Sequence, residues 1–370
     1  MRIATFNVEN LFDRAKVMNL GDWSNGKPVL EDFAKLSALL GEQTYTAARK
    51  TRMVDLLTSL GLAKSDTGPY VILRRNRGDL LKRPAGGGIE ITASGRADWS
   101  GSLELIDAPV DDEAMRNTAR VISDLQADVL AVIEAESRPA LLAFNDEIVK
   151  AVGGKPFDNV MLIDGNDSRG IDVGLLTRAS HPIGQMRSHV DDRDAGGTRI
   201  FSRDCPEFGV GLPDGRTMWV LVNHLKSKGY GSPAATAARR KLQAARVKAI
   251  YDDLVARGET LVAVVGDFND TPGSAALAPL LQGTDLRDVF GHPAFDNGGY
   301  PGTYGPSTAS NKIDFLLLSP ALYAVVQGGG VWRKGMWPGT HPAKWPVYEV
   351  LVKPDQAASD HAAVWVDLAS

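Results

Sequence analysis

The sequence has a single cysteine, Cys205, and it lacks both long apolar runs and any excess of positive charge. One cysteine cannot form an intrachain disulfide, and it excludes a zinc site built from several cysteines. No apolar run approaches the roughly 20 residues that a transmembrane helix needs. The formal net charge of -4 provides no global basic field, so any binding of nucleic acid must depend on a local patch.

The N-terminus lacks the apolar segment of a secretory signal peptide, because the chain starts directly with a short β-type sequence. We therefore expect a cytoplasmic protein, and the sequence indicates neither a transmembrane segment nor a protein partner. Of its 370 residues, 44% are hydrophobic and 23% are charged, which is ordinary for a globular protein with a large core. No internal repeat or Pro/Gly/Ser-rich linker divides the chain, so we predict a single domain over residues 1–370.

Apolar strands alternate with amphipathic helices along the chain. Helices are expected at 46–60, 111–126, 138–152 and 234–256. Strands are expected at 2–6, 129–133, 172–176, 217–222, 261–265, 313–318 and 362–366. Apolar strands flanked by helices imply sheets that are covered on their faces, so we predict an α/β fold. Residues 70–106 differ, because short β-type pieces and glycine turns predict an inserted β-ribbon.

One expected strand ends in a pair of polar side chains. The apolar run 261–265 is followed by Gly266 and Asp267, and Asn269 lies two residues further on. Residues two apart in a strand point to the same side, so Asp267 and Asn269 would be aimed together past the strand end. A carboxylate and an amide in this position could orient a water molecule or hold a phosphate group.

Similar polar clusters stand at other expected strands. In chain order they are Asn7 and Glu9, Glu134 and Glu136, Asn223 and His224, Asp314, and Asp360 with His361. Asp314 differs from the others, because it interrupts an apolar strand instead of following one. A single cluster would be weak evidence, but several of them favour one shared site.

These side chains suit the hydrolysis of a phosphate ester. Mg²⁺ and Mn²⁺ prefer carboxylate, amide and water oxygens, which Asn7, Glu134 and Asp360 can supply. Asp267 can orient or deprotonate the attacking water. Imidazole and amide groups can stabilise the charge that develops on phosphate. The candidates for this role are His224, His361, Asn223 and Asn269.

Asp314 and His361 can form a carboxylate–histidine pair. An imidazolium beside a carboxylate has a raised pKa, so their contact would keep His361 protonated and oriented. Taken alone, His361 has the plainer interpretation of a surface histidine, and Asp267 that of a turn former. Their occurrence within one set of motifs favours the catalytic interpretation.

The polar clusters lie within six short motifs. These are Thr5-Phe6-Asn7-Val8-Glu9-Asn10, Ala131-Val132-Ile133-Glu134, Val222-Asn223-His224-Leu225-Lys226, Gly266-Asp267-Phe268-Asn269, Lys312-Ile313-Asp314-Phe315 and Ser359-Asp360-His361. In sequence and order they resemble the endonuclease/exonuclease/phosphatase superfamily, which includes pancreatic-type deoxyribonucleases, neutral sphingomyelinases and inositol polyphosphate 5-phosphatases. The resemblance spans residues 7–361. One departure is Ile133, because the family commonly has Gln before its metal-binding glutamate.

The resemblance implies a fold and a role for each residue. The fold is a four-layer α/β/β/α sandwich, with two packed mixed β-sheets and helices outside. The implied metal ligands are Glu134, as the principal one, with Asn7, Glu9 and Asp360. The implied catalytic residues are His224, Asp267, Asn269, Asp314 and His361. Arg169 lies where some members bind a substrate phosphate, a role that we also expect for Asn223.

We therefore expect a Mg²⁺- or Mn²⁺-dependent phosphodiester hydrolase, with a nuclease acting on DNA or RNA as the leading hypothesis. The alternative is a phosphoesterase for small-molecule or lipid head groups, either inositol-phosphate-like or sphingomyelin-like. The lack of an obvious membrane-binding amphipathic segment argues against a lipid substrate. A metal-binding scaffold without activity is disfavoured, because none of the core motif residues is missing.

Two other segments have alternative interpretations. The basic residues within 74–83 form either a phosphate contact or, as we slightly prefer, a solvated face. The tryptophans Trp332, Trp337 and Trp345 form either a stacking platform for bases or the packing of a long loop. The sequence does not separate these interpretations.

Several charged residues outside the motifs are expected to have no catalytic role. His181, His189, His292 and His341 lie in loop-like surroundings and are expected at the surface. Asp172 is expected at the start of a strand, paired with Arg169, and a direct catalytic role is less favoured. Glu136 is expected to be solvated or to support the site from outside it.

Overall fold

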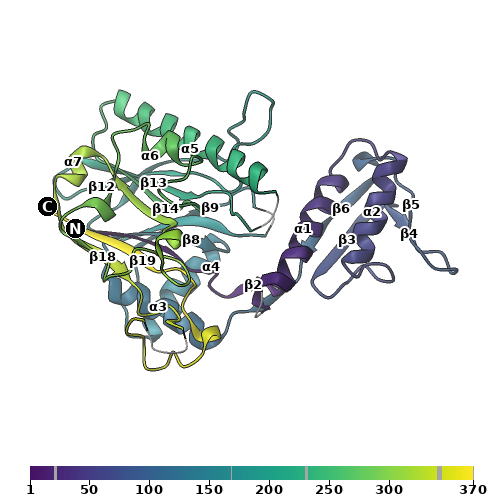
Figure 1. The fold of residues 1–370 in the computed structure, drawn as a ribbon, viewed down its shortest axis with the longest axis horizontal. Helices are drawn as coiled ribbons and strands as arrows, with labels where there is room; N and C mark the ends of the chain where they lie inside the picture. Colours follow the sequence, from purple (N-terminus) through teal and green to yellow (C-terminus); the bar gives the residue numbers. More distant parts are fainter. Residues whose placement is uncertain (21–22, 168, 230–231, 340–343, 370) are drawn as a thin grey trace. The chain divides into compact units, whose positions relative to one another are not determined.

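A computed structural model of the chain describes residues 1–20, 23–167, 169–229, 232–339 and 344–369 (Figure 1). The described chain forms two compact units. Unit 1 consists of Met1–Phe12, Val110–Lys228 and Ser232–Ser370, and unit 2 consists of Asp13–Pro109. Each unit contains buried apolar clusters of its own.

Unit 1 contains two large mixed β-sheets. Across the first sheet the strands are β16 (Phe295–Asp296), β18 (Val326–Trp332), β19 (Ala363–Leu368), β1 (Arg2–Asn7), β8 (Val129–Ala135), β10 (Asp172–Thr177) and β9 (Asn159–Ile163). Across the second they are β11 (Ile183–Arg187), β12 (Glu207–Gly211), β13 (Thr217–His224), β14 (Val262–Asp267), β17 (Asp314–Leu318) and β15 (Arg287–Asp288). The predicted α/β class is therefore confirmed, and each predicted strand matches a strand of these sheets within two residues at either end.

Buried side chains cover both faces of each large sheet. One cluster combines residues from both sheets, among them Ile133 of β8 and Val265 of β14. The opposite face of the first sheet shares a cluster with α3 (Asp112–Leu125), which contributes Ile122. The opposite face of the second sheet shares a cluster with α5 (Pro233–Ala256), which contributes Ile250. Burial on both faces explains why these strands are apolar almost throughout.

The helices of unit 1 largely follow the sequence signals. Asp111 begins α3 as predicted, since its carboxylate accepts hydrogen bonds from the N–H groups of Glu113 and Ala114, at 2.9 and 3.3 Å. The helix predicted at 138–152 is instead α4 (Arg138–Ala143) followed by a π-helical segment, η3 (Phe144–Val149). The shorter helices are α6 (Ala278–Leu281), α7 (Pro320–Tyr323), η4 (Val289–Gly291), η5 (Ala309–Asn311) and η6 (Pro354–Gln356).

Unit 2 packs two helices and short strands around a larger and a smaller apolar cluster. Its elements are β2 (Asp13–Ala15), η1 (Lys16–Asn19), α1 (Trp23–Leu40), α2 (Ala47–Ser59), β3 (Val71–Gly78), β4 (Leu81–Lys82), β5 (Glu90–Ile91), η2 (Arg96–Asp98), β6 (Trp99–Leu105) and β7 (Asp107–Pro109). The predicted ribbon, 70–106, contains β3 to β6 and lies within this larger unit. We did not predict α1, whose Gly26 and Pro28 disfavour a helix in the sequence, although Phe33 and Leu36 bury one of its faces.

In the part of the chain that the structure describes, no helix combines the length and the apolar character needed to cross a membrane.

Candidate active site

The directions of the strands bring the polar clusters to one edge of the first sheet. β1 and β8 run parallel, and Asn7 at the end of β1 pairs in register with Ile133. Glu134 therefore follows at the same edge. β19 runs antiparallel to β1, so its amino end, which His361 precedes, lies at this edge as well.

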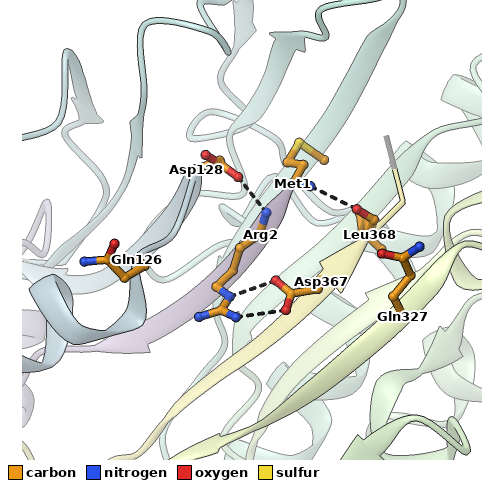
Figure 2. A pocket seen from close by; sticks show the side chains of 7 residues that line it. All are labelled: Met1, Arg2, Gln126, Asp128, Gln327, Asp367 and Leu368. Atoms are coloured by element: carbon orange, nitrogen blue, oxygen red, sulfur yellow. Dashed lines mark hydrogen bonds and ion pairs between the residues drawn. The ribbon is translucent and has the colours of Figure 1, made fainter.

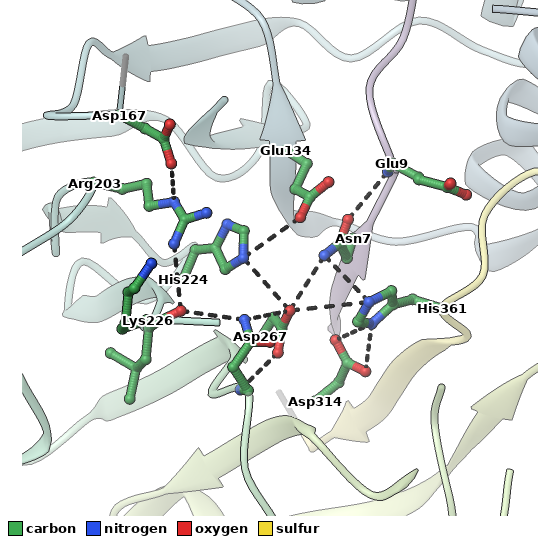
Figure 3. Close-up of polar contacts among 12 residues, drawn as sticks. Asn7, Glu9, Glu134, Asp167, Arg203, His224, Lys226, Asp267, Asp314 and His361 are labelled. Carbon is green, nitrogen blue, oxygen red and sulfur yellow. Dashed lines mark hydrogen bonds and ion pairs between the residues drawn. The ribbon is translucent and has the colours of Figure 1, made fainter. Parts of the chain in front are cut away.

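The second sheet contributes in the same way. β13 and β14 run parallel, and their terminal residues His224 and Asp267 are in register. β17 runs antiparallel to β14 and starts with Asp314, which is paired with Asp267. Parallel strands thus supply residues from their carboxyl ends, while an antiparallel strand supplies one from its amino end. Figure 3 shows these side chains converging on Asp267.

Asp267 lies at the centre of the site and is 2% exposed. Its carboxylate accepts hydrogen bonds from Asn269, from the backbone N–H at 2.7 Å and from Nδ2 at 3.0 Å. Asn7 Nδ2 lies 3.4 Å from Asp267 Oδ2. Burial raises the pKa of Asp267 to about 7; the charge of His361 opposes this rise, and the nearby carboxylate of Asp314 reinforces it.

His361 pairs with Asp314. The imidazole Nδ1 lies 2.9 Å from Asp314 Oδ2 and 3.1 Å from Oδ1. Burial disfavours the charged ring, but the negative charge of Asp314 and the hydrogen bond to it outweigh burial and raise the pKa of His361 well above its usual value. His361 is therefore an imidazolium at neutral pH, with Nε2 at 3.9 Å from Asp267 Oδ2.

His224 flanks Asp267 from another direction. Its Nε2 lies 3.4 Å from Glu134 Oε1 and 3.6 Å from Asp267 Oδ2. Burial lowers the pKa of His224 well below its usual value, and the positive charges of Arg203 and Arg169 lower it further. A neutral imidazole can still donate one hydrogen bond. The two histidines beside Asp267 thus differ in charge.

Asn7, Glu9 and Asp360 form the remaining part of the site. Asn7 is buried, and its Oδ1 accepts a hydrogen bond from the backbone N–H of Glu9 at 3.0 Å. Glu9 Oε2 accepts one from the backbone N–H of Asp360 at 3.1 Å. Both carboxylates are partly exposed. This group therefore forms the more open side of the site.

The backbone is strained at the same strand ends. Glu9, Glu134 and Asn269 have φ of 51°, 68° and 53°, in the left-handed region that residues with a Cβ rarely adopt. Gly266 has φ of 124°, and a Cβ there would lie 2.0 Å from the carbonyl oxygen of Asn223. Such conformations persist where the surrounding structure enforces them, and they are frequent at active sites.

The two residues expected to bind phosphate have different surroundings. Arg169 pairs with Asp167 through Nε and Nη2, at 2.9 and 2.7 Å. Arg203, which is buried, contacts the same carboxylate at 2.8 Å. Asn223 points away from His224, its neighbour in β13; its Nδ2 donates to the carbonyl of Leu221 at 3.2 Å. Asn223 therefore lies outside the cluster around Asp267.

Three further residues contact the site; sequence reasoning missed Lys312 and Arg203, and it interpreted Thr303-Tyr304 only as resembling a family element that lines the substrate cleft. Thr303 Oγ1 donates to Asp314 Oδ2 at 2.6 Å. Lys312 Nζ donates to the backbone carbonyl of Asp314 at 2.9 Å, and it is buried. A charged lysine directly before an apolar strand was the available signal for Lys312. The contact of Arg203 with Asp167 depends on a distant segment and had no comparable local signal, and the Thr303-Tyr304 element did not indicate the contact with Asp314.

Glu136 supports the segment that follows β1. Its Oε1 accepts hydrogen bonds from the backbone N–H groups of Leu11 and Phe12, at 2.9 and 2.7 Å. The carboxylate therefore connects β8 with the chain beyond Asn7. Asp172, at the start of β10, accepts a hydrogen bond from the N–H of Gly165 at 2.8 Å.

The surface placement of two histidines was wrong. His181 is 5% exposed and His189 is 7% exposed. His189 lies between two carboxylates, with Nδ1 at 2.9 Å from Asp192 and Nε2 at 2.7 Å from Glu207. Buried partners outweigh the polar, loop-like composition of this segment. His292 is partly exposed, and His341 lies outside the described residues.

The tryptophans and the basic segment have structural contacts. Trp345 is 7% exposed and donates from Nε1 to the carbonyl of Met336 at 3.2 Å. Trp332 and Trp337 pack against the cluster that includes α3, which supports the packing interpretation. In the basic segment, the arginines 74, 75 and 83 pair with Glu104 or Asp66, as on a solvated face.

Two groups of described residues could hold a metal ion. One comprises Glu134, His224 and Asp267, and the other comprises Asp267, Asp314 and His361; within each group the ligand atoms lie within 4.8 Å of one another. The second group already contains the imidazolium of His361. The first combines the carboxylates of Glu134 and Asp267 with a neutral histidine, and its members present oxygen and nitrogen ligand atoms to one another. A divalent cation beside Glu134 fits this donor set.

A pocket of about 570 Å³ lies at the opposite end of β1 from Asn7 (Figure 2). Its lining residues are Met1, Arg2, Gln126, Asp128, Gln327, Asp367 and Leu368. Asp367 holds the Arg2 guanidinium through two contacts of 2.8 Å. Asp128 accepts a hydrogen bond from the Arg2 backbone at 2.7 Å. These pairs join β1 to β19 and to the residue before β8, at the end of β1 opposite Asn7.

Comparisons with solved structures find similar folds. The mannosyl-6-phosphatase Bt3783 of Bacteroides thetaiotaomicron VPI-5482 is 17% identical, with 70% of this chain and 92% of that chain covered and a TM-score of 0.50. Truncated TDP2 of Caenorhabditis elegans is 15% identical, with 70% and 91% covered and a TM-score of 0.49. The human Nocturnin catalytic domain with bound sulfate is 14% identical, with 70% and 87% covered and a TM-score of 0.47. At such identities the first of these supports a shared fold alone.

Sequence comparison identifies the family. No curated protein matches the chain in sequence. Residues 106–361, well over half of the chain, match the model of the Endonuclease/Exonuclease/phosphatase family. The matched segment contains His224, Asp267 and His361, which meet at the strand ends. The chain therefore belongs to the endonuclease/exonuclease/phosphatase family.

Proposed function

We propose that the protein is a Mg²⁺- or Mn²⁺-dependent phosphodiester hydrolase, with nucleic acid as its leading substrate class. Family membership supports hydrolysis of phosphoester bonds. The observation that carries the proposal is the pair of histidines beside Asp267, whose Nε2 atoms lie 3.6 Å (His224) and 3.9 Å (His361) from Asp267 Oδ2. A diester needs both a stabilised phosphate charge and a donor near the leaving oxygen, and two such groups are available.

Asp267 is the proposed base that orients the attacking water. A carboxyl group whose pKa lies near 7 can accept a proton at neutral pH more readily than an ordinary aspartate. Both oxygens of its carboxylate contact Asn269, which limits its rotation. Asn269 is the proposed donor to a phosphate oxygen, in exchange for the hydrogen bond that its Nδ2 donates to the carbonyl of Leu225 at 3.1 Å.

His361 and His224 have different proposed roles. Asp314 keeps His361 charged and fixes its ring through Nδ1, so Nε2 can donate to a phosphate oxygen as negative charge develops. His224 is neutral, and its Nε2–H can donate without adding a full charge to the site. Together they would hold two oxygens of the phosphate on opposite sides of Asp267.

Glu134 is the proposed principal cation ligand, with Asn7, Glu9 and Asp360 contributing from the more open side. Oxygen donors of this kind favour Mg²⁺ or Mn²⁺ over softer metals. A bound cation would neutralise charge on a phosphate oxygen and favour attack at phosphorus. The ligand atoms of Glu134, His224 and Asp267, which lie within 4.8 Å of one another, support a cation here.

Arg169 and Asn223 remain the proposed contacts to substrate phosphate, with unequal support. The pairing of Arg169 and Arg203 with a single carboxylate, Asp167, leaves net positive charge near His224, which favours an anion. For Asn223 the support is weaker, because its amide donates to the backbone carbonyl of Leu221 and not toward Asp267.

The proposed architecture is a four-layer α/β/β/α sandwich, in which unit 2 is an insertion between β1 and α3. The cluster shared by the two sheets, and the separate clusters with α3 and α5, support four layers. In the sequence, unit 2 interrupts unit 1 between Phe12 and Val110. The single-domain organisation with a ribbon at 70–106 stays a prediction.

The second candidate is a phosphoesterase that acts on small-molecule or lipid head-group phosphates. One structure with a similar fold is described as a mannosyl-6-phosphatase, which keeps a phosphomonoester among the candidate substrates. A monoester leaves more negative charge on phosphate than a diester, so its hydrolysis would depend more strongly on the cation.

A substrate panel tests the proposal. Purified protein is assayed with plasmid DNA, RNA, an aryl phosphodiester, an aryl phosphomonoester and a sphingomyelin head-group analogue, in Mg²⁺, Mn²⁺ or EDTA. We expect cation-dependent hydrolysis of diesters, with nucleic acid hydrolysed fastest. Replacement of Asp267 or His361 by Ala should reduce kcat by about 100-fold or more.

The controls are His292→Ala and Asp191→Asn, which alter a partly exposed histidine and an exposed aspartate. Both should retain the rate of the unaltered protein. Substantial activity in Asp267→Ala and His361→Ala would contradict the proposed mechanism. Exclusive hydrolysis of the monoester would favour the second candidate.

A further inference from the structure

Thr303 is fully buried in the segment before β17. Its hydroxyl lies within hydrogen-bond distance of four groups at or just before the start of that strand. Oγ1 lies 2.6 Å from Asp314 Oδ2, and it accepts hydrogen bonds from the backbone N–H groups of Asp314 and Ile313, at 3.1 and 3.2 Å. The carbonyl of Asn311 lies further away, at 3.4 Å.

These distances assign the hydroxyl proton. A hydroxyl has one proton to donate and two lone pairs that accept. The carboxylate of Asp314 is charged and 0.8 Å closer than the carbonyl of Asn311 (3.4 versus 2.6 Å), and hydrogen bonds to charged groups are the stronger ones. The proton is therefore donated to Asp314, and the two N–H groups use both lone pairs. The hydrogen-bonding capacity of Thr303 Oγ1 is fully used around Asp314.

The backbone of Thr303 contacts the other partner of the pair. Its carbonyl accepts a hydrogen bond from the N–H of Ala362, the residue after His361, at 2.7 Å. Tyr304, the next residue, forms an isolated β-bridge with His361. One residue thus joins the two segments that carry Asp314 and His361, which are 47 positions apart in the sequence.

The carboxylate of Asp314 needs this support. Rotation about the bond to a carboxylate is soft, because its energy wells are broad. Among the described residues, the side-chain contacts of Asp314 are those to His361 and Thr303. Lys312 anchors only the backbone carbonyl of Asp314. Without the hydroxyl, the carboxylate could rotate together with the imidazole that it is meant to fix.

We propose that Thr303 is a positioning residue, whose hydroxyl fixes the carboxylate of Asp314 and through it the ring of His361. The effect on catalysis rests on the proposed function of the site, while the effect on His361 does not. Groups that orient a catalytic residue from behind commonly change rates by about 10- to 100-fold when removed.

The test compares Thr303→Val, which keeps the shape of the side chain and removes the hydroxyl, with Thr303→Ser, which keeps the hydroxyl. The matched control is Thr177→Val. Thr177 is equally buried and its hydroxyl accepts a hydrogen bond from Asn159, but it lies at the end of β10 remote from Asp172. For each variant we would measure kcat, KM and the free energy of unfolding, and record the Nδ1 proton of His361 by NMR, assigned with His361→Gln.

In Thr303→Val we expect kcat to fall about 10- to 100-fold with KM changed less than about threefold, since orientation and not binding is lost. The Nδ1 proton signal should shift or broaden. Thr303→Ser should restore both the rate and the signal. Thr177→Val, which also removes a buried hydroxyl, should keep kcat.

Two results would overturn the inference. One is a wild-type kcat and an unchanged Nδ1 signal in Thr303→Val. The other is a loss of kcat in Thr177→Val that equals the loss in Thr303→Val, which would indicate a general effect of stability. If the unaltered protein hydrolyses no substrate of the panel, the proposed function fails, and the NMR comparison alone decides the role of Thr303.

Discussion

Replacement of Asp172 by Asn should make the free energy of unfolding less sensitive to pH. Asp172 is 5% exposed, and its Oδ1 accepts a hydrogen bond from the N–H of Gly165. Burial raises the pKa of Asp172 to about 6; the hydrogen bond from Gly165 and the charge of Arg203 oppose this rise, and Asp164 and Asp167 reinforce it. An asparagine keeps the oxygen that Gly165 contacts and removes the titration.

The sign follows from comparing the folded and unfolded pKa values. The pKa rises from 3.8 to about 6 on folding, so the folded state binds the proton more tightly. Stability from this group is therefore greatest below pH 4 and is lost as the pH rises through about 6. A shift of about two units corresponds to a full loss of about 3 kcal/mol.

Roughly half of this loss falls in an accessible range of pH. At pH 5 the unfolded carboxyl is already ionised and the folded one is mostly protonated, so about 1.6 kcal/mol has been lost; by pH 8 the loss reaches about 3 kcal/mol. The free energy of unfolding of Asp172→Asn, relative to the unaltered protein, should therefore rise by about 1.4 kcal/mol between pH 5 and pH 8.

Urea denaturation at pH 5, 6, 7 and 8, followed by tryptophan fluorescence, measures this difference. Asp191→Asn is the control, because it makes the same replacement at a side chain that is 73% exposed. A rise below about 0.5 kcal/mol for Asp172→Asn, within the error of linear extrapolation, would refute the reasoning. Retained kcat in this variant would also argue against a catalytic role for Asp172.

Two further substitutions test the supports of the site. Gly266→Ala places a Cβ 2.0 Å from the carbonyl oxygen of Asn223, so the end of β14 must move and kcat should fall about 100-fold. The control is Gly273→Ala, because Gly273 has open space around it. Unchanged kcat in Gly266→Ala would contradict the argument. Lys312→Met removes the partner of Asp288, at 2.9 Å, and should lower the free energy of unfolding by about 3 kcal/mol. Adding Asp288→Asn should recover part of that loss in urea denaturation, and no recovery would show that the ion pair is not its cause.

Local sequence signals predicted much of the fold. Asp111 marked the start of α3, because an aspartate followed by acidic residues and an apolar stripe is typical of a helix N-terminus. The apolar run before Gly266 predicted β14, because a short continuous apolar run is typical of a strand that is buried on both faces. These signals lie within a few residues of the structure that they predict, so they can be interpreted without knowledge of distant segments. The pattern failed for α1, where Pro28 and Gly26 outweighed a buried face that only packing reveals.

The candidate site was predictable to a different extent for different residues. Asp267, Asn269 and His224 lie at the ends of apolar strands, and their motifs indicated one shared site. The expected reason for the contact between Asp267 and Asn269 was wrong, because β14 ends at Asp267 and Asn269 reaches it from a turn with a φ of 53°. Alternation does separate His224 from Asn223, whose amide donates to the carbonyl of Leu221. The burial of His189 between two carboxylates could not be inferred, because its partners are not evident from the surrounding sequence.

By itself the sequence determined which chemical groups the protein can use and the strand ends at which they stand. Apolar runs, turn residues and the order of the motifs are local properties, and the chain displays them directly. Only the tertiary structure decided which of these groups meet. Asn7 and His361 are 354 positions apart, and they become neighbours because β19 runs antiparallel to β1. The pKa of Asp267, the different charge states of its two histidines and the support from Thr303 all depend on burial and on contacts between strands, which no local stretch of the sequence specifies.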